Sequence, residues 1–354
     1  DHGVQLNWRA LIEGGIFEFM HRIILTDIKP PIYHELMRVH GRKLNAWIYS
    51  QLERRVPELD EVFFDKLKRW FDYPEENRLE KKLLRAAHYL ATQWEFGIIY
   101  HFNQAIYGIG ATKAAIESNI EDHYDLAGVQ KISLKGKTSK FIDLVGQLRF
   151  QKRWAQSPRV PETSVMGHVL IVAILGYFCA AELGACDERI VNDFLCGLFH
   201  DLPEVLTRDI ISPVKTSVEG LDDLIKDIEK RQVAEKLLPL LPWGWHEEII
   251  YFTQNEFTNR VMLDGVPTEV SEEKLNGKYN VDGHGYKAVD GRMLKGCDHL
   301  AAFVEAYLST EYGITSKHLL NGMADLREKY KNKTITGINF GAVYDEFPEL
   351  KTNL

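Results

Sequence analysis

The chain has few cysteines and no excess of basic charge. Its 354 residues include four cysteines, and none of them forms the C-x-x-C spacing of zinc or redox sites. We therefore expect reduced cysteines in the core. The formal net charge of −8 argues against a nucleic-acid partner, because phosphate backbones are bound by a concentrated basic face. Small anionic substrates are compatible with this net charge, since a metal ion and a few Arg or Lys side chains can bind them locally.

The sequence also contains little that indicates export or a membrane. No N-terminal stretch combines basic residues, an apolar run and a small-residue cleavage site, so we predict a cytoplasmic enzyme. One run, residues 165–183, is nearly all apolar. It contains His168 and Glu182, and polar side chains are costly in lipid without partners. We interpret it as the central helix of a helical bundle, with no membrane partner.

Helical periodicity dominates the chain. Apolar residues in 31–52 and in 75–100 recur at helical spacing, and the acidic start Glu75-Glu76 suits the positive end of a helix dipole. Strand-like alternation is rare before residue 250. With 45% hydrophobic residues the chain can bury a substantial core, in one large or two moderate domains. These features predict an all-α protein.

Composition shifts suggest the domain limits. Turn formers and lysines in 131–140 break the apolar pattern, so we predict an N-terminal helical domain at 1–135 and a second domain at 136–330, followed by an extension at 331–354.

A Gly-rich stretch at 255–295 is interpreted as an insertion in the second domain. Short runs within it, such as 278–281, are predicted to pair as a hairpin. We consider two roles for this insertion: it either covers the metal site as a lid or forms an oligomer contact.

Four residues in the second domain are typical metal ligands. His168 lies in the apolar run, His200 and Asp201 are adjacent, and Asp298 follows the insertion. Two imidazoles and two carboxylates suit one divalent ion such as Mn, Fe, Co, Ni or Zn, and leave positions free for water and substrate. Free positions indicate hydrolysis. We therefore predict a metal centre of His168, His200, Asp201 and Asp298.

Glu204 is the candidate acid or base beside this centre. It follows His200 by four residues and Asp201 by three, so a helical turn returns it to the same face, unless Pro203 kinks that turn. We predict that Glu204 and Asp201 are catalytic, with Glu204 as the general base or as the acid that protonates the leaving oxygen. Three further histidines are not expected to be ligands: His246, His284 and His299.

The motif-bearing segment resembles a known family. Residues 200–209, followed by Ser212-Pro213-Val214-Lys215, are similar to the His-Asp-x-x-Glu-Val-Leu-Thr-x-Asp run that ends in Pro-Val-Lys in HD-domain metal-dependent phosphohydrolases, and most closely in the bacterial 5'-deoxynucleotidases. Arg153-Trp154 precedes His168 as in that group. The resemblance covers about residues 141–310 and implies an HD helical bundle.

The resemblance also implies substrate contacts. Arg153 matches the phosphate-binding arginine, and Trp154 matches the residue that packs near the sugar and disfavours a 2'-hydroxyl. Asp209 matches the carboxylate on the nucleoside side, and Lys215 is a further phosphate contact. A structural ion pair is the alternative for Arg153 and Asp209.

Two positions depart from the group's pattern and bear on substrate choice. Gly167 replaces the acidic residue that commonly precedes this histidine, and Arg208 stands where glycine is usual.

Three functions follow as hypotheses. The first is hydrolysis of a deoxyribonucleoside 5'-monophosphate, the second an HD phosphodiesterase or nucleoside triphosphohydrolase, and the third a nucleotide-binding sensor or scaffold without turnover. The resemblance suggests a homodimer, unless the N-terminal half covers the usual contact surface.

The first half contains a short internal similarity. Residues 70–75 resemble 199–204, with Phe71 in place of His200, and the same interval that separates His168 from His200 leads back to residue 39, next to His40. A degenerate HD-like repeat and a chance likeness of two helix ends both remain open.

Overall fold

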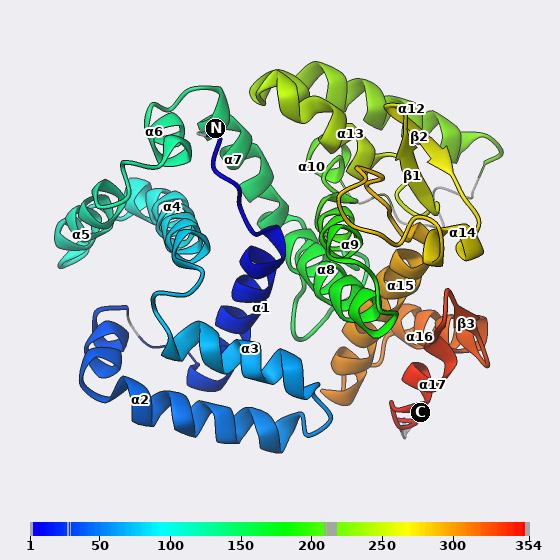
Figure 1. Ribbon diagram of the computed structural model, residues 1–354, viewed down its shortest axis with the longest axis horizontal. Coiled ribbons are helices and arrows are strands. Elements are labelled where there is room, and N and C mark those ends of the chain that lie inside the picture. The colour runs from blue at the N-terminus through cyan, green and yellow to red at the C-terminus, as the bar shows by residue number, and fades with distance from the viewer. Residues whose placement is uncertain (1–2, 27, 29, 209, 211–217, 351–354) are drawn as a thin grey trace. The chain divides into compact units, whose positions relative to one another are not determined.

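A computed structural model describes residues 3–26, 28, 30–208, 210 and 218–350, and helices dominate it (Figure 1). Among these residues the strands form only two small antiparallel sheets. The predicted all-α class is confirmed. The chain divides into two compact units, Asp1–Lys131 and Ile132–Leu354, and the residues predicted as a C-terminal extension belong to the second. The predicted domain limits stay a prediction.

The first unit is built from helices. They are α1 (Trp8–Leu25), α2 (Pro30–Arg55), α3 (Glu61–Asp72), α4 (Arg78–Phe102), α5 (Ile109–Glu121) and α6 (Ala127–Ser133), the last of which reaches into the second unit. The predicted start of the fourth helix at Glu75 is wrong, because α4 begins at Arg78. Glu76 instead accepts a hydrogen bond from Arg69 of α3 at 2.8 Å, so the acidic pair belongs to the turn before the helix.

Phe71 packs against His21, and not against His40, to which the repeat hypothesis points. Its ring stacks on His21 of α1 with the centroids 4.3 Å apart, while His40 lies exposed on α2. The Nε2 atom of His21 lies 3.3 Å from Asn45 Oδ1, and Asn45 donates to Asp72 at 3.1 Å. This network connects α1, α2 and α3, and the degenerate repeat stays a prediction.

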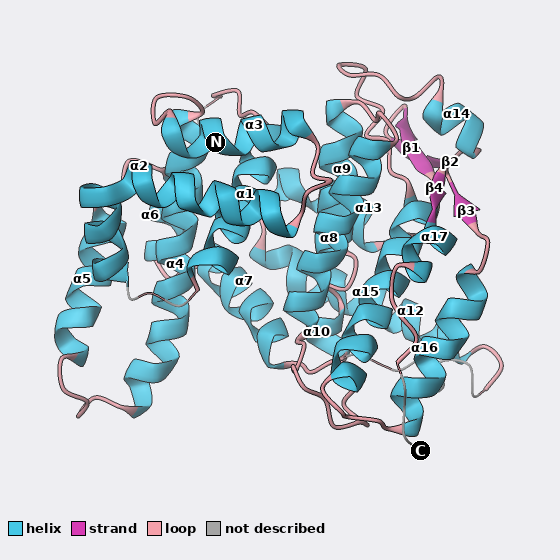
Figure 2. Ribbon diagram, turned by 90° about the horizontal axis from the view of Figure 1, so that it is seen from below, coloured by secondary structure: helices cyan, strands magenta, loops and turns pink. Residues whose placement is uncertain are grey.

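The second unit contains the predicted motifs. Its longer helices are α7 (Lys137–Gly146), α8 (Val165–Glu182), α9 (Asp187–Phe199), α12 (Leu221–Gln232), α13 (His246–Thr253), α15 (Gly291–Glu311) and α16 (Lys317–Tyr330). Shorter ones are α10 (Glu204–Thr207), α14 (Glu272–Asn276) and α17 (Phe340–Asp345), with 3₁₀ turns at Gln147–Phe150, Leu238–Leu240 and Trp243–Trp245 and a π turn at Val233–Leu237. Helix α8 packs against α9 and α15, and α16 packs against α15 (Figure 2).

Helix α8 is the single described helix that is long and apolar enough to cross a membrane. In the structure it packs against two neighbouring helices, and its His168 is completely buried. The Ser164 side chain caps its first turn by accepting from the Gly167 amide. This packing agrees with the predicted central helix of a bundle.

The Gly-rich stretch contains a hairpin, as predicted, but other residues form it than the run 278–281. Strands β1 (Arg260–Leu263) and β2 (Val266–Glu269) pair across Asp264-Gly265, whereas 278–281 contains no strand. Asp264 and Gly265 both have positive φ, at 50° and 78°, which is the conformation that a two-residue Asp-Gly turn adopts. A second pair follows near the end of the chain, β3 (Thr334–Ile335) with β4 (Ile338–Asn339).

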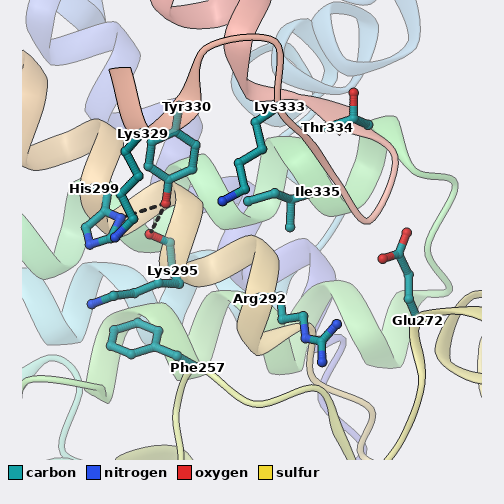
Figure 3. Close-up of a pocket in the computed structure, with 10 residues that line it drawn as sticks. All are labelled: Phe257, Glu272, Arg292, Lys295, His299, Lys329, Tyr330, Lys333, Thr334 and Ile335. Carbon is teal, nitrogen blue, oxygen red and sulfur yellow. Dashed lines mark hydrogen bonds between the residues drawn. The ribbon is translucent and has the colours of Figure 1, made fainter. Parts of the chain in front are cut away.

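The end of α16 is fixed to α15 by a short polar contact. The Tyr330 hydroxyl lies 2.6 Å from Nδ1 of His299 and 3.4 Å from the Lys295 carbonyl oxygen, to which it donates (Figure 3). His299 follows Asp298 in the sequence, but its side chain contacts Tyr330 of α16.

Candidate metal centre

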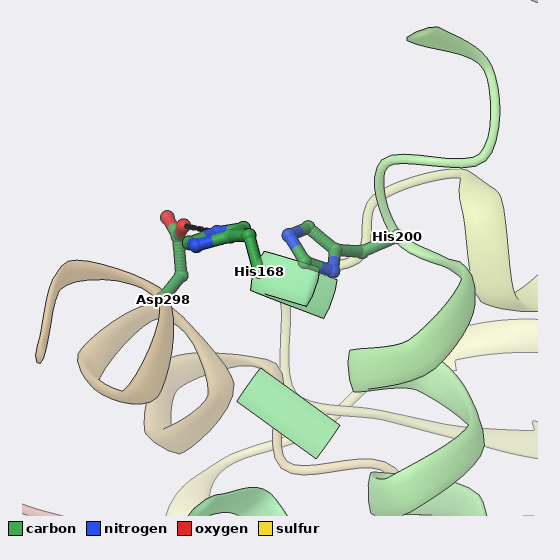
Figure 4. Close-up of side chains that lie close together, drawn as sticks. All are labelled: His168, His200 and Asp298. Atoms are coloured by element: carbon green, nitrogen blue, oxygen red, sulfur yellow. Dashed lines mark hydrogen bonds and ion pairs between the residues drawn. The ribbon is translucent and has the colours of Figure 1, made fainter. Parts of the chain in front are cut away.

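Three of the four predicted ligands come together in the second unit. Ligand atoms of His168, His200 and Asp298 all lie within 4.8 Å of one another (Figure 4). His168 is in the first turn of α8, His200 directly follows α9, and Asp298 lies on α15. The imidazoles are 0% and 6% exposed. Three separate helices thus bring nitrogen and oxygen donors to one buried point.

A buried ionic network sets α9 against α15. Arg189 of α9 donates to Asp290 at 2.8 Å, and the Asp290 amide donates to Asp193 at 2.7 Å. Asp290 also caps α15 by accepting from the Met293 amide. Arg189 is 1% exposed and both carboxylates are 0% exposed, so the pairing is fully desolvated and fixes the helix that bears Asp298 relative to the helix that precedes His200.

Both histidines direct Nε2 toward the cluster because Nδ1 is bound elsewhere. Nδ1 of His200 lies 2.8 Å from the Gly197 carbonyl, which can only accept, so Nδ1 carries the hydrogen. Nδ1 of His168 lies 2.9 Å from Glu305 Oε1. Oxygen acceptors at Nδ1 are the usual supports of metal-binding histidines.

Glu305 is a site residue that the sequence analysis missed. Besides His168, it accepts from Trp154 Nε1 at 3.0 Å and from Arg159 Nη1 at 3.3 Å. Arg153 Nε lies 3.7 Å from the same carboxylate oxygen. Burial would raise the pKa of Glu305, but His168, Arg153 and Arg159 outweigh it and lower that pKa. The carboxylate is therefore ionised and orients His168.

Asp201 borders the three-residue cluster. Its Oδ2 lies 3.2 Å from His200 Nε2 and 3.9 Å from Arg153 Nη1. Burial would raise the Asp201 pKa, but the positive charges of His200, His168 and Arg153 outweigh burial, so the pKa lies below its usual value. Burial likewise disfavours protonated His200, yet Asp201 raises its pKa to about 9. The carboxylates are thus anionic, and the imidazoles are held in positive form beside them.

The donor set fits a divalent cation. His168 Nε2 and Asp298 Oδ1 are 3.0 Å apart, close to the separation of adjacent ligands for bonds of about 2.1 Å. The buried Nε2 of His200 lies 3.2 Å from Asp201 Oδ2 without a well-formed hydrogen bond, and a divalent ion would bind this nitrogen by displacing the proton that Asp201 favours there. Burial would raise the Asp298 pKa, but Lys295 and His168 lower it well below its usual value. An ion would replace the positive charge that these neighbours provide.

The other predicted site residues have different positions. Glu204 is buried at the start of α10, and its amide donates to the Asp201 carbonyl at 3.0 Å, so the turn at Pro203 continues into a helix. Trp154 and Arg153 both lie against Glu305. Asp209 and Lys215 lie outside the described residues.

Arg208 has an unusual backbone conformation for a residue with a side chain. Its φ of 67° and ψ of 164° belong to a region that is populated almost only by glycine. The Cβ atom of Arg208 is therefore a source of backbone strain at the end of α10.

Comparison with known proteins bears on the second unit. The HD domain family matches residues 145–327, just over half of the chain. A 5'-deoxynucleotidase of Photobacterium profundum, PBPRA2627, is 29% identical over 116 residues, which cover 31% of this chain and 58% of that protein. The 5'-deoxynucleotidase YfbR of Salmonella typhi is 31% identical over 119 residues, which cover 31% of this chain and 57% of that protein. The chain spans less than two thirds of the length of these relatives.

A solved structure aligns with part of the chain. The crystal structure of an HD-domain phosphohydrolase from Listeria innocua aligns with a TM-score of 0.40 and 13% identity, over 59% of this chain and 82% of that one.

Proposed function

The chain belongs to the HD domain family, and we propose that it is a metal-dependent phosphohydrolase with His168, His200, Asp201 and Asp298 as its metal ligands. The observation that carries the proposal is the convergence of donors from α8, α9 and α15 on one buried point. A divalent ion bound there supplies an activated water, with a pKa lowered from about 15.7 towards about 7, and neutralises charge on a phosphoryl oxygen.

We assign the surrounding residues to binding and proton transfer. The Arg153 guanidinium lies between the carboxylates of Asp201 and Glu305, so a planar donor group is already held beside the cluster. Its geometry suits two oxygens of a phosphate. Glu204 is three residues from Asp201 on a continuing helical turn, which supports its role as the group that takes the proton of the attacking water or donates one to the leaving oxygen.

The substrate that we propose is a deoxyribonucleoside 5'-monophosphate. It is supported by the Arg153-Trp154 pair and by the relatives named as 5'-deoxynucleotidases. Trp154 donates its Nε1 hydrogen to Glu305, which fixes the indole plane next to the site. We place the enzyme in the cytoplasm, and we propose that it assembles as a homodimer.

A nucleotide panel tests this function. Purified protein is analysed for metal, then assayed with added Mn or Co on deoxyribonucleoside and ribonucleoside mono-, di- and triphosphates. Release of free phosphate from 5'-deoxyribonucleoside monophosphates is the expected result. Release of pyrophosphate or triphosphate, or cleavage of a diester, would instead support a triphosphohydrolase or phosphodiesterase, and nucleotide binding without turnover with any metal would support a sensor.

Two variants separate metal binding from proton transfer. Asp298→Ala should lose both the metal and the activity, because it removes one of the three clustered donors. Glu204→Gln should keep the metal and lose about 10²- to 10⁴-fold in kcat, the usual contribution of a general acid or base. Full activity of Glu204→Gln would refute its assignment.

A further inference from the structure

A basic pocket lies beside the candidate metal centre in the second unit. Its volume is about 370 Å³, within the range of small-molecule sites (Figure 3). Arg292 and Lys295 come from α15, Lys329 from the last turn of α16, and Lys333 from the loop before β3. Glu272 is the single acid among the described residues that line it.

The positive charge in this pocket is largely uncompensated. Among the described residues, no carboxylate forms an ion pair with Arg292, Lys329 or Lys333. The chain as a whole carries a net charge of −8, so four cations around one cavity are a local concentration and not a consequence of composition. An anion between these like charges would relieve their mutual repulsion.

The electrostatics of Lys329 agree with this geometry. Burial lowers the Lys329 pKa, and the neighbouring charges of Lys295 and Lys333 lower it further. These like charges act on one another across the pocket, so an anion placed between them would interact favourably with all of them.

We propose that this pocket is an anion site that binds the phosphate groups of a small phosphorylated molecule. Because Lys295 is paired with Asp298, three cations remain for a ligand. A carboxylate brings one negative charge to them, whereas a phosphate or pyrophosphate group brings two or more. Arg292 offers paired planar donors, and the lysines offer point charges, both of which bind phosphate oxygens. The rings of Phe257 and Tyr330 add an apolar wall.

Lys295 connects the pocket with the metal centre. Its Nζ atom lies 2.9 Å from Oδ2 of Asp298 and 3.9 Å from the centroid of the Phe257 ring. Phe257 in turn lies 5.7 Å from the His200 ring, centroid to centroid. The phosphate that the pocket receives therefore belongs either to the substrate of the metal centre or to a separate ligand bound next to it.

Titration of metal-stripped, full-length protein with inorganic pyrophosphate tests the proposal. By calorimetry at about 0.15 M salt, we expect saturable binding at one site per chain. Salt at this concentration screens charges that are more than about 8 Å apart, but not direct contacts between the anion and the pocket. Arg292→Ala/Lys333→Ala should weaken it by at least about tenfold, because two charge-assisted contacts are lost. The matched pair Lys317→Ala/Lys331→Ala removes the same charge from exposed positions that do not line the pocket, and should change affinity by less than about twofold.

Both exchanged side chains of the pocket pair are exposed, so the fold should survive, and the single variants Arg292→Gln and Lys333→Gln provide smaller perturbations if it does not. Absence of pyrophosphate binding to the native protein would overturn the proposal. Equal binding by the native protein and by a folded pocket variant would overturn it as well. The titration needs neither metal nor turnover, so its outcome is independent of the proposed function.

The source of the phosphate is decided with metal-loaded enzyme. If the pocket variants raise KM for the best substrate of the nucleotide panel, the pocket receives the substrate's own phosphate. If KM is unchanged and pyrophosphate alters the rate without competing with substrate, the phosphate belongs to a separate ligand.

Discussion

Glu305 connects the candidate metal centre with the substrate side at the scale of single residues. One of its oxygens holds His168, and the other accepts from Trp154 and Arg159. A carboxylate behind a metal-binding histidine raises the basicity of the imidazole and fixes its orientation. Since Glu305 does not itself belong to the cluster of ligand atoms, we expect it to act as a positioning residue.

Glu305→Gln should weaken metal binding by about 10- to 100-fold. The amide oxygen still accepts from His168, but the negative charge that favours the bound form is lost. Equilibrium dialysis with Mn measures the affinity, and thermal unfolding of the metal-free variant reports the separate effect of leaving Arg159 without its ionic partner.

The matched control is Glu311→Gln, an exposed position at the end of the same helix, which should bind Mn as the native protein does. If Glu305→Gln folds and retains native affinity, the carboxylate serves only Arg159 and Trp154.

Arg208 gives a prediction about stability. Its backbone occupies a glycine region while its amide donates to the Glu204 carbonyl at 2.7 Å, so the strain is held in place by the turn that also positions Glu204. Arg208→Gly should raise the free energy of unfolding by about 1 kcal/mol, because strained positions of this kind cost about 1–3 kcal/mol. Urea unfolding measures the change. Arg208→Ala keeps the Cβ atom and should gain nothing, and equal stability of the two variants would contradict the explanation.

The residues that cluster in the structure could be singled out from the sequence as candidate ligands, but their neighbours could not. His168, His200 and Asp298 stand out because they are ligand types within a recognisable motif. Glu305 left a weaker signal: it lies two helical turns after Asp298 and is the only charged residue in 301–308. Its partner Trp154 lies 151 residues away, and no local pattern connects them.

At the scale of helices and strands, the periodicity of the sequence predicts which elements are present better than it predicts where each begins and ends. The apolar spacing in 31–52 corresponds to α2, of which Ile48 and Leu52 are buried, whereas Leu36, Val39 and Trp47 are exposed. The predicted start of α4 at Glu75 is wrong because Glu76 lies in the turn before the helix, where it pairs with Arg69. The hairpin forms at the Asp-Gly turn of 264–265 and not at the β-prone run 278–281, because two residues with positive φ let the flanking strands pair directly.

Small residues allow α8 and α9 to pack closely. A Cβ atom on Gly197 would lie 2.9 Å from the Cα of Ala173, so a substitution there must separate the two helices. Gly197→Ala should therefore lower the free energy of unfolding by about 1–3 kcal/mol. It should also weaken metal binding, because His200 follows three residues later and its Nδ1 is bound by the Gly197 carbonyl.

Gly97→Ala is the matched exchange in α4, where a Cβ atom would meet nothing within 4 Å. It should raise stability by about 0.5–1 kcal/mol, the usual gain in an open helix interior. Chemical unfolding followed by circular dichroism compares the two variants. If both exchanges changed stability alike, close packing of α8 on α9 would not be the reason for glycine at 197.

At the scale of the whole molecule, the described site residues are confined to one compact unit. The cluster, Glu305 and the basic pocket all fall within Ile132–Leu354, and the ionic network of Arg189, Asp193 and Asp290 that orders its helices lies there too. The buried cluster around Val165, Leu202 and Leu237 provides this unit with a core of its own.

A fragment of residues 132–354 should therefore fold alone and bind metal with the stoichiometry of the full chain. Its size is typical of an independent domain, and each described donor of the centre remains in it. Elemental analysis after loading with Mn, together with cooperative thermal unfolding, measures the two properties. The fragment 1–131 is the control and should retain no metal above background. A folded 132–354 fragment without metal would show that the first unit completes the centre, and would refute a site built by α8, α9 and α15 alone.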